Sequence, residues 1–147
     1  MSLKERLRED WKLAMKSRDS FKAGVISMAR ASILQSEKTD GKTLDDDQVI
    51  DVLSKEIKQR KEAIVEFERG NRPDLVDQTK KEIEILLDYL PQQLTEDEIQ
   101  EIVREVIIEV GANSIKDMGK VMASVQPRVR GRADGKIVSQ IVKEQLS

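Results

Sequence analysis

The chain of 147 residues contains no cysteine and no histidine. These absences exclude disulfide bridges, a thiol nucleophile, a Ser-His-Asp triad and the usual zinc sites. Aromatic residues make up only 3% of the chain, which argues against base-stacking platforms of exposed rings. The four aromatic side chains are instead expected in the core or between helices: Trp11, Phe21, Phe67 and Tyr89.

Long apolar runs are also missing. No stretch approaches the roughly 18 consecutive apolar residues of a membrane-spanning helix, so no membrane partner is expected. The first ten residues, MSLKERLRED, lack the apolar core of a signal peptide. These features predict a cytoplasmic location.

Charge of either sign is abundant but nearly balanced. Charged residues make up 37% of the chain and the net charge is −2, which fits helices with solvated outer faces. Because the whole molecule has no positive field, any attraction for nucleic acid must come from a local patch.

Apolar residues recur at helical spacing throughout, so the sequence predicts an all-α fold. Pro91 marks a boundary between a four-helix domain over residues 1–90 and a three-helix tail domain over residues 91–147. Two helix starts carry capping-box pairs, Asp45 with Gln48 and Thr95 with Glu98.

One predicted helix carries a seam typical of antiparallel bundles. Ile50, Ile57 and Ile64 repeat every seven residues, and Leu53 lies between them. Polar Arg60 interrupts this seam. With Lys58 and Lys61 it forms either a second basic site or, more simply, part of a solvated helix face.

The segment from residue 116 to 136 is the strongest candidate for a binding site. It carries six cations against two carboxylates, a net charge of +4, and Pro127 is expected to open a basic loop within it. Arginine forks and lysines there suit the phosphates of RNA, whereas the simpler alternative is a solvated turn in which Asp134 caps the last helix. The candidate RNA-binding residues are Lys116, Lys120, Arg128, Arg130, Arg132 and Lys136.

Spacing adds detail to this candidate site. Lys116 and Lys120 are four residues apart and are expected on one helix face. Gly131 and Gly135 would let the backbone approach a ligand closely. Gly119 lies inside a predicted helix, where glycine is less stable than alanine. Close packing explains its presence there better than a close approach to RNA.

No catalytic residue, cofactor or metal site is assigned. The sequence shows no nucleophile beside a base and no phosphate-binding glycine loop. The acidic run of residues 45–47 lacks calcium-loop spacing and is better explained by helix capping.

Several motifs together resemble the GatB/YqeY family over nearly the whole chain. They comprise EIKQR at 56–60, GNRPDLV at 70–76, LPQQL at 90–94, GA at 111–112, KDMGKVM at 116–122 and RGRADGK at 130–136. The first ninety residues resemble free-standing YqeY-like proteins. The remainder is similar to the tail domain of the B subunit of the tRNA-dependent amidotransferase, although that tail usually has Ala-Asn-Pro where this chain has Ala133, Asp134 and Gly135.

This resemblance implies a non-catalytic protein that binds tRNA or another structured RNA through the tail. A family-level assignment as a carbon–nitrogen ligase with glutamine as amido-N-donor would reflect kinship, because the chain resembles none of that enzyme's catalytic parts. The alternative is a helical protein–protein adaptor that docks on an amidotransferase or an aminoacyl-tRNA synthetase. An accessory enzyme activity is a third, weaker reading.

Overall fold

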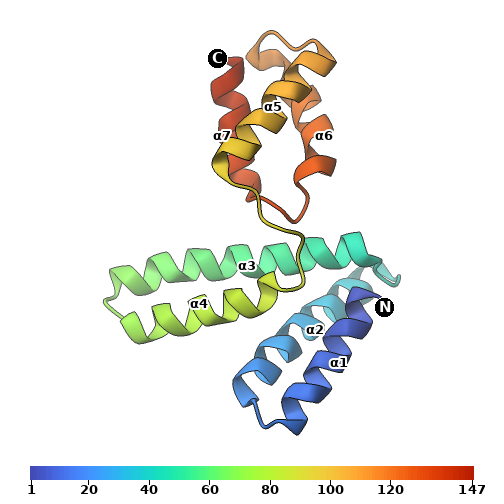
Figure 1. Ribbon diagram of the computed structural model, residues 1–147, viewed down its shortest axis with the longest axis vertical. Helices are drawn as coiled ribbons and strands as arrows, with labels where there is room; N and C mark the ends of the chain where they lie inside the picture. The colour runs from blue at the N-terminus through green and yellow to red at the C-terminus, as the bar shows by residue number, and fades with distance from the viewer. The chain divides into compact units, whose positions relative to one another are not determined.

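The computed structural model describes all 147 residues, and its regular structure is entirely helical. The prediction of an all-α protein is therefore confirmed. The chain forms seven α-helices, labelled in Figure 1, and a short 3₁₀ turn before α6. The elements are α1 Leu3–Lys16, α2 Ser20–Asp40, α3 Asp46–Arg69, α4 Pro73–Leu87, α5 Glu96–Val110, η1 Ile115–Asp117, α6 Met118–Val129 and α7 Gly135–Leu146.

The contacts divide the chain into two units, Met1–Leu90 and Pro91–Ser147. In the first unit, α1 pairs with α2 and α3 pairs with α4, while α2 also packs against α3 and α4. Its core includes side chains that are completely buried, among them Leu7, Ile26 and Leu53. Each helix thus buries one apolar stripe against its neighbours.

Capping residues account for several helix starts. Asp45 and Gln48 form a reciprocal capping box at the start of α3, and Thr95 and Glu98 do the same for α5. Each box satisfies backbone N–H groups that the first helical turn leaves without partners. Both predicted capping pairs are therefore confirmed.

The predicted seam on α3 is only partly buried. Leu53 and Ile57 are buried, whereas Ile50 and Ile64 are half-buried. Arg60 is 7% exposed, so neither a basic surface site nor a solvated face describes it. Phe21, expected within the core, is 40% exposed on α2.

The tail unit packs α5 against both α6 and α7, around a core made largely of valine. Val103, Val121, Val125, Val138 and Val142 are completely buried. Compact β-branched side chains fill this small core and let three short helices lie close together.

Helix α6 runs through Pro127 and ends at Val129, so the expectation that Pro127 opens the loop is wrong. Proline removes one backbone donor, but its fixed φ is compatible with a helix. The last turn is held by the Arg130 N–H, which donates to the Gln126 carbonyl at 3.0 Å. The loop after α6 is therefore confined to residues 130–134, here called the basic turn.

Candidate nucleic-acid interface

The basic turn links α6 to α7 with a defined backbone path. Gly131 has φ +70°, a left-handed conformation that glycine adopts without steric cost. The Arg132 N–H donates to the Val129 carbonyl at 2.8 Å. The Asp134 carboxylate accepts from the Lys136 N–H at 2.9 Å and caps α7, as the sequence predicted.

Three hydrogen bonds fasten the basic turn to the segment before α5. The Leu94 N–H donates to the Arg132 carbonyl at 2.8 Å, and the Gln93 side-chain amide donates to the Gly131 carbonyl at 2.7 Å. The Arg132 guanidinium donates to the Gln92 carbonyl at 3.2 Å. Two motifs far apart in sequence, 90–94 and 130–136, thus form one local structure.

Nearby carboxylates neutralise part of the positive charge. The Arg128 guanidinium pairs with Glu105 of α5 at 2.7 Å. The pKa of Glu98 lies below its ordinary value because of hydrogen bonds from the backbone and side chain of Thr95, with a smaller contribution from the charge of Arg132. Arg128 and Arg132 therefore already have partners, which a phosphate would replace or share.

The six predicted cations do not form one patch. Arg128, Arg130, Arg132 and Lys136 lie at the carboxyl end of α6 and the start of α7, whereas Lys116 and Lys120 lie at the other end of α6. Arg130 follows Lys120 by ten positions, which corresponds to about 15 Å along the helix axis. Lys116 belongs to η1, so the prediction that it shares a helix face with Lys120 is wrong.

The predicted glycines play different parts. Only Gly131 has the positive φ that favours glycine. A Cβ placed on Gly119 or Gly135 would meet no atom within 4 Å, so internal packing does not explain either residue. The packing explanation for Gly119 is therefore wrong.

Sequence reasoning missed the contribution of Gln92 and Gln93 to the turn. No local pattern marks glutamines that bind residues 38 and 40 positions away.

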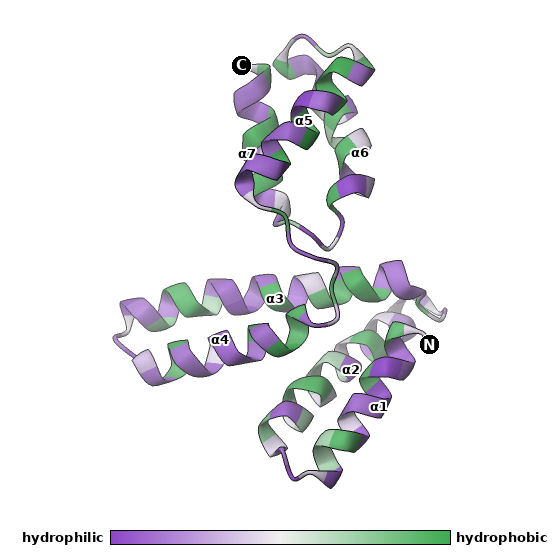
Figure 2. Ribbon diagram, viewed as in Figure 1, coloured by the Kyte–Doolittle hydropathy of each residue, from purple (hydrophilic) through white to green (hydrophobic).

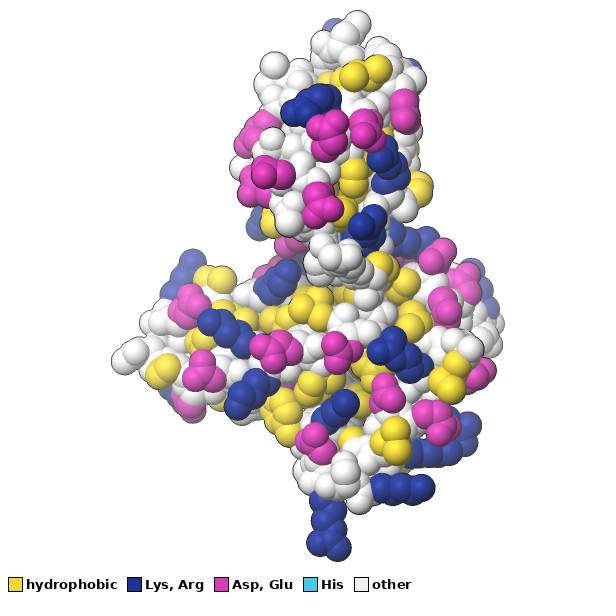
Figure 3. Space-filling view, viewed as in Figure 1, with side chains coloured by type: hydrophobic (Ala, Val, Ile, Leu, Met, Phe, Trp, Pro, Cys, Tyr) yellow, Lys and Arg dark blue, Asp and Glu magenta, His cyan; other side chains and the backbone are white.

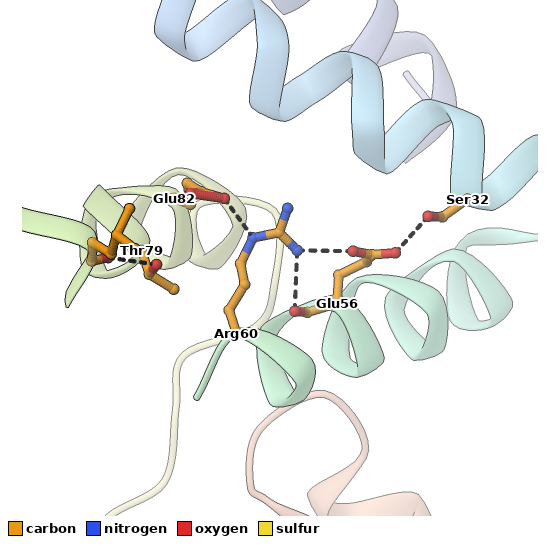
Figure 4. A network of polar contacts seen from close by, with 6 residues as sticks. Ser32, Glu56, Arg60, Thr79 and Glu82 are labelled. Atoms are coloured by element: carbon orange, nitrogen blue, oxygen red, sulfur yellow. Dashed lines mark hydrogen bonds and ion pairs between the residues drawn. The ribbon is translucent and has the colours of Figure 1, made fainter. Parts of the chain in front are cut away.

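Sequence reasoning also missed a polar network within the first unit, where the Arg60 guanidinium pairs with Glu56 at 2.8 Å and Glu82 at 3.1 Å. Figure 4 shows Arg60 between these carboxylates, with the Ser32 hydroxyl donating to Glu56 from α2.

The one available signal for this network was the spacing of Glu56 and Arg60, four residues apart on a helix. The contribution of Glu82 comes from α4 and depends on how α3 and α4 pack. The network ties α2, α3 and α4 together and leaves Arg60 with no free charge to offer a ligand.

Two further observations bear on function. No group of three or more acidic side chains gathers in a way that would hold a metal ion. None of the helices has both the length and the apolar character needed to cross a membrane.

Comparison with known protein families identifies the family of this chain. Residues 4–146 match the family described as Yqey-like protein, which is nearly the full length. The chain belongs to the YqeY-like family. The resemblance seen in the motifs of the sequence is thereby confirmed.

Curated relatives of this YqeY-like protein include fungal proteins named Altered inheritance of mitochondria protein 41, mitochondrial. The one from Lachancea thermotolerans is 40% identical over 87 residues, covering 58% of this chain and 46% of the relative. The one from Pyrenophora tritici-repentis is 31% identical over 123 residues, covering 80% and 68% respectively. A Saccharomyces cerevisiae relative is 36% identical over 87 residues, covering 58% and 47%.

The chain spans about half the length of the Lachancea and Saccharomyces relatives. Their names also correct one prediction. Because these relatives are named as mitochondrial proteins, they point to mitochondria and contradict the expectation of a cytoplasmic location.

Proposed function

We propose that this YqeY-like protein is a non-catalytic binder of tRNA or another structured RNA, and that the basic turn of the tail makes the contact. The observation that carries the proposal is the gathering of three cations: Arg130 and Arg132 lie on the basic turn, whose backbone is fixed by residues 92–94, and Lys136 lies in the first turn of α7 directly after it. A fixed turn presents its cations to phosphates with little loss of conformational freedom on binding.

Phosphate recognition explains the composition of the turn. Arginine donates two parallel hydrogen bonds to a phosphate, and the start of α7 adds the partial positive charge of its first N–H groups. Lys143 lies seven residues after Lys136 on α7, so both exposed lysines share one helix face and extend the contact. The resemblance to the amidotransferase tail also supports RNA as the ligand.

The contact is expected to be small. On the face seen in Figure 3, basic and acidic side chains are intermingled over the tail. Binding should therefore depend on the basic turn itself and should weaken steeply as salt rises.

The test is binding of fluorescently labelled, unfractionated tRNA across a salt series. Wild type is compared with a variant in which Arg128, Arg130, Arg132 and Lys136 are all replaced by alanine. A Lys116→Ala, Lys120→Ala double variant is the matched control, because it removes cations from the other end of α6. Circular dichroism checks that all three proteins remain folded.

We expect the quadruple variant to lose binding by at least ten-fold and the control to change little. A Glu105→Gln variant should bind more tightly, since it releases Arg128. No binding by wild type at low salt, or equal losses in both alanine variants, would contradict the proposal.

A protein–protein adaptor would need an apolar surface that the protein's own packing leaves uncovered. The seam on α3 offers little of this surface, because Leu53 and Ile57 are buried within the first unit and Ile50 and Ile64 are half-buried. Larger exposed apolar side chains lie on α2, among them Met28 and Leu34.

A further inference from the structure

The outward face of α2 carries no charge over four helical turns, in a chain of which 37% is charged. Met28 is 57% exposed and Leu34 is 51% exposed. The other side of the helix is apolar as well, and Figure 2 colours much of α2 green or white. The exposed residues of this face, here called the α2 face, are Phe21, Gly24, Ser27, Met28, Ala31, Leu34 and Gln35.

The opposite side of α2 already fills the core of the first unit. Ala23, Val25, Ile26, Ala29 and Ile33 are buried there. A helix that is apolar all round is normally buried all round. The α2 face is thus an apolar surface beyond what the unit needs for its own packing.

A groove of about 480 Å³ runs between α1 and α2 beside this face. Its apolar lining includes Leu7, Ile33 and Leu34, and Arg8 and Arg30 border it. The Arg30 guanidinium lies 5.3 Å from the centre of the Trp11 ring, and Arg8 is exposed on α1. Two carboxylates also line the groove, Glu5 and Glu37, and Glu37 is already paired with Lys4. The groove therefore combines an apolar floor with a rim on which cations outnumber carboxylates.

The charge of the helical hairpin formed by α1 and α2, which contains the groove, favours an acidic partner. Residues 1–42 contain ten Lys or Arg against six Asp or Glu, a net charge of +4. Residues 43–90 contain eight against thirteen, a net charge of −5. The positive charge of the first unit is thus concentrated on the two helices that border the groove.

Gly24 points to a helical partner. It lies inside α2, where glycine costs about 1 kcal/mol relative to alanine. A Cβ at this position would meet no atom within 4 Å, so the chain's own packing does not require glycine. Close approach of a second helix from outside would use the missing side chain.

We propose that the α2 face and its groove bind an acidic amphipathic helix of a partner protein. The apolar stripe of that helix would pack on Met28, Ala31 and Leu34, and its carboxylates would pair with Arg8 and Arg30. This docking mode uses anchors at helical spacing, with charge complementarity fixing the orientation. It is independent of the RNA contact, which involves the other unit.

Two other occupants fit less well. A second copy using the same face would bring two hairpins of charge +4 together, because a two-fold interface pairs each patch with itself. A lipid surface would favour an unbroken row of bulky apolar anchors, whereas small or polar residues interrupt the bulky ones on this face, namely Gly24, Ser27 and Gln35.

The experiment uses the full chain and a yeast-displayed library of 18-residue helical peptides. All peptides share an Ala/Leu/Met stripe, and the flanking positions are acidic, basic or uncharged. Peptides enriched on wild type are then measured against Met28→Lys and Arg8→Glu. Ile108→Lys and Lys116→Glu, on exposed positions of the other unit, provide the same kinds of change as controls.

The proposal predicts enrichment of acid-flanked peptides, at least ten-fold weaker binding to Met28→Lys, weaker binding to Arg8→Glu, and unchanged binding to both controls. Several results would overturn it: no enrichment, equal enrichment of basic or uncharged peptides, or equal binding to Met28→Lys. Sedimentation showing a dimer that Met28→Lys dissociates would assign the face to a second copy. Binding to phosphatidylglycerol vesicles that exceeds peptide binding would assign it to lipid.

Discussion

Among the buried residues, Arg60 is the one that carries a charge. Its guanidinium bonds to two carboxylates, from α3 and α4, and to the Glu56 carbonyl at 3.1 Å. Placing a cation in a core is costly unless its partners are positioned by the fold. The network therefore depends on correct pairing of α3 with α4, and it is sensitive to loss of any one member.

Replacing Arg60 by methionine is expected to lower the free energy of unfolding by about 3 kcal/mol, because two mostly buried carboxylates lose their partner. The side chains of Glu56 and Glu82 are 16% and 17% exposed. Urea unfolding at neutral pH measures the change. A triple variant that also carries Glu56→Gln and Glu82→Gln should recover most of the loss, and a stable single variant would refute this account.

Ser54 presents the opposite case of a buried polar atom without a partner, since its hydroxyl oxygen makes no hydrogen bond. Ser54→Ala removes this orphan group and introduces a better helix former into α3. We expect a gain of about 1 kcal/mol in the free energy of unfolding. A loss of stability in the same urea assay would show that the hydroxyl has a partner in solution.

The helices differ in how their two faces are used. Most combine one buried stripe with a charged outer face, whereas α2 has an outer face without charge. Their starts depend on capping side chains, most clearly in α3 and α5. The start of a helix therefore depends on its capping side chains, and the surface it presents depends on the residues at its exposed positions.

Gly24→Ala is expected to raise the free energy of unfolding by about 0.5–1 kcal/mol, because alanine favours the helix and its Cβ meets no atom within 4 Å. Thermal and urea unfolding followed by circular dichroism measure this. The same variant should bind acid-flanked peptides less well, since the added methyl group keeps a partner helix at a distance. Unchanged or reduced stability would contradict the open environment seen here.

The Thr95–Glu98 box gives α5 a pH-dependent start. The pKa of Glu98 is held below its ordinary value of 4.5 by hydrogen bonds from Thr95. The stabilisation that the ionised Glu98 carboxylate provides is therefore complete above pH 4.5. It is lost as the pH falls through the lower pKa of Glu98 in the folded state. Glu98→Gln keeps a side-chain acceptor but cannot titrate.

We therefore expect the melting temperature of wild type to fall more than that of Glu98→Gln between pH 6 and pH 3. Calorimetry over this range compares the two proteins, and the remaining carboxylates act as a common background. Parallel curves would show that the charge of Glu98 contributes nothing to the stability of the tail.

At the scale of the whole molecule, two hydrophobic clusters share no residue. One lies within Met1–Leu90 and the other within Pro91–Ser147. Charge is unevenly distributed as well: of the net charge of −2, residues 1–42 contribute +4 and the rest of the chain contributes −6. The two proposed binding surfaces therefore belong to different units and can be disrupted separately.

Because Met1–Leu90 contains a complete core, a fragment of these residues is expected to fold and to melt cooperatively. The 57-residue tail is small for an independent domain, so its fragment should be less stable. Circular dichroism with urea titration of both fragments tests this. A non-cooperative melt of the larger fragment would show that its core is insufficient.

Local sequence was enough to predict the helical class, the two capping boxes and the cap at Asp134. These features depend on apolar period and on side chains within about four residues of the groups they satisfy. Such short-range interactions can be predicted from a short stretch of sequence. The same argument failed at Pro127, where the neighbouring turns kept the helix intact in spite of the missing N–H.

The tertiary structure decided which polar residues have partners and which cations lie together. Arg60 is buried because α4 brings Glu82 from 22 residues away, and the basic turn is fixed by partners up to 40 residues away. Packing also separated Lys116 and Lys120 from the basic turn and left the α2 face uncovered. These outcomes depend on how whole helices pack, and no spacing within one segment encodes that.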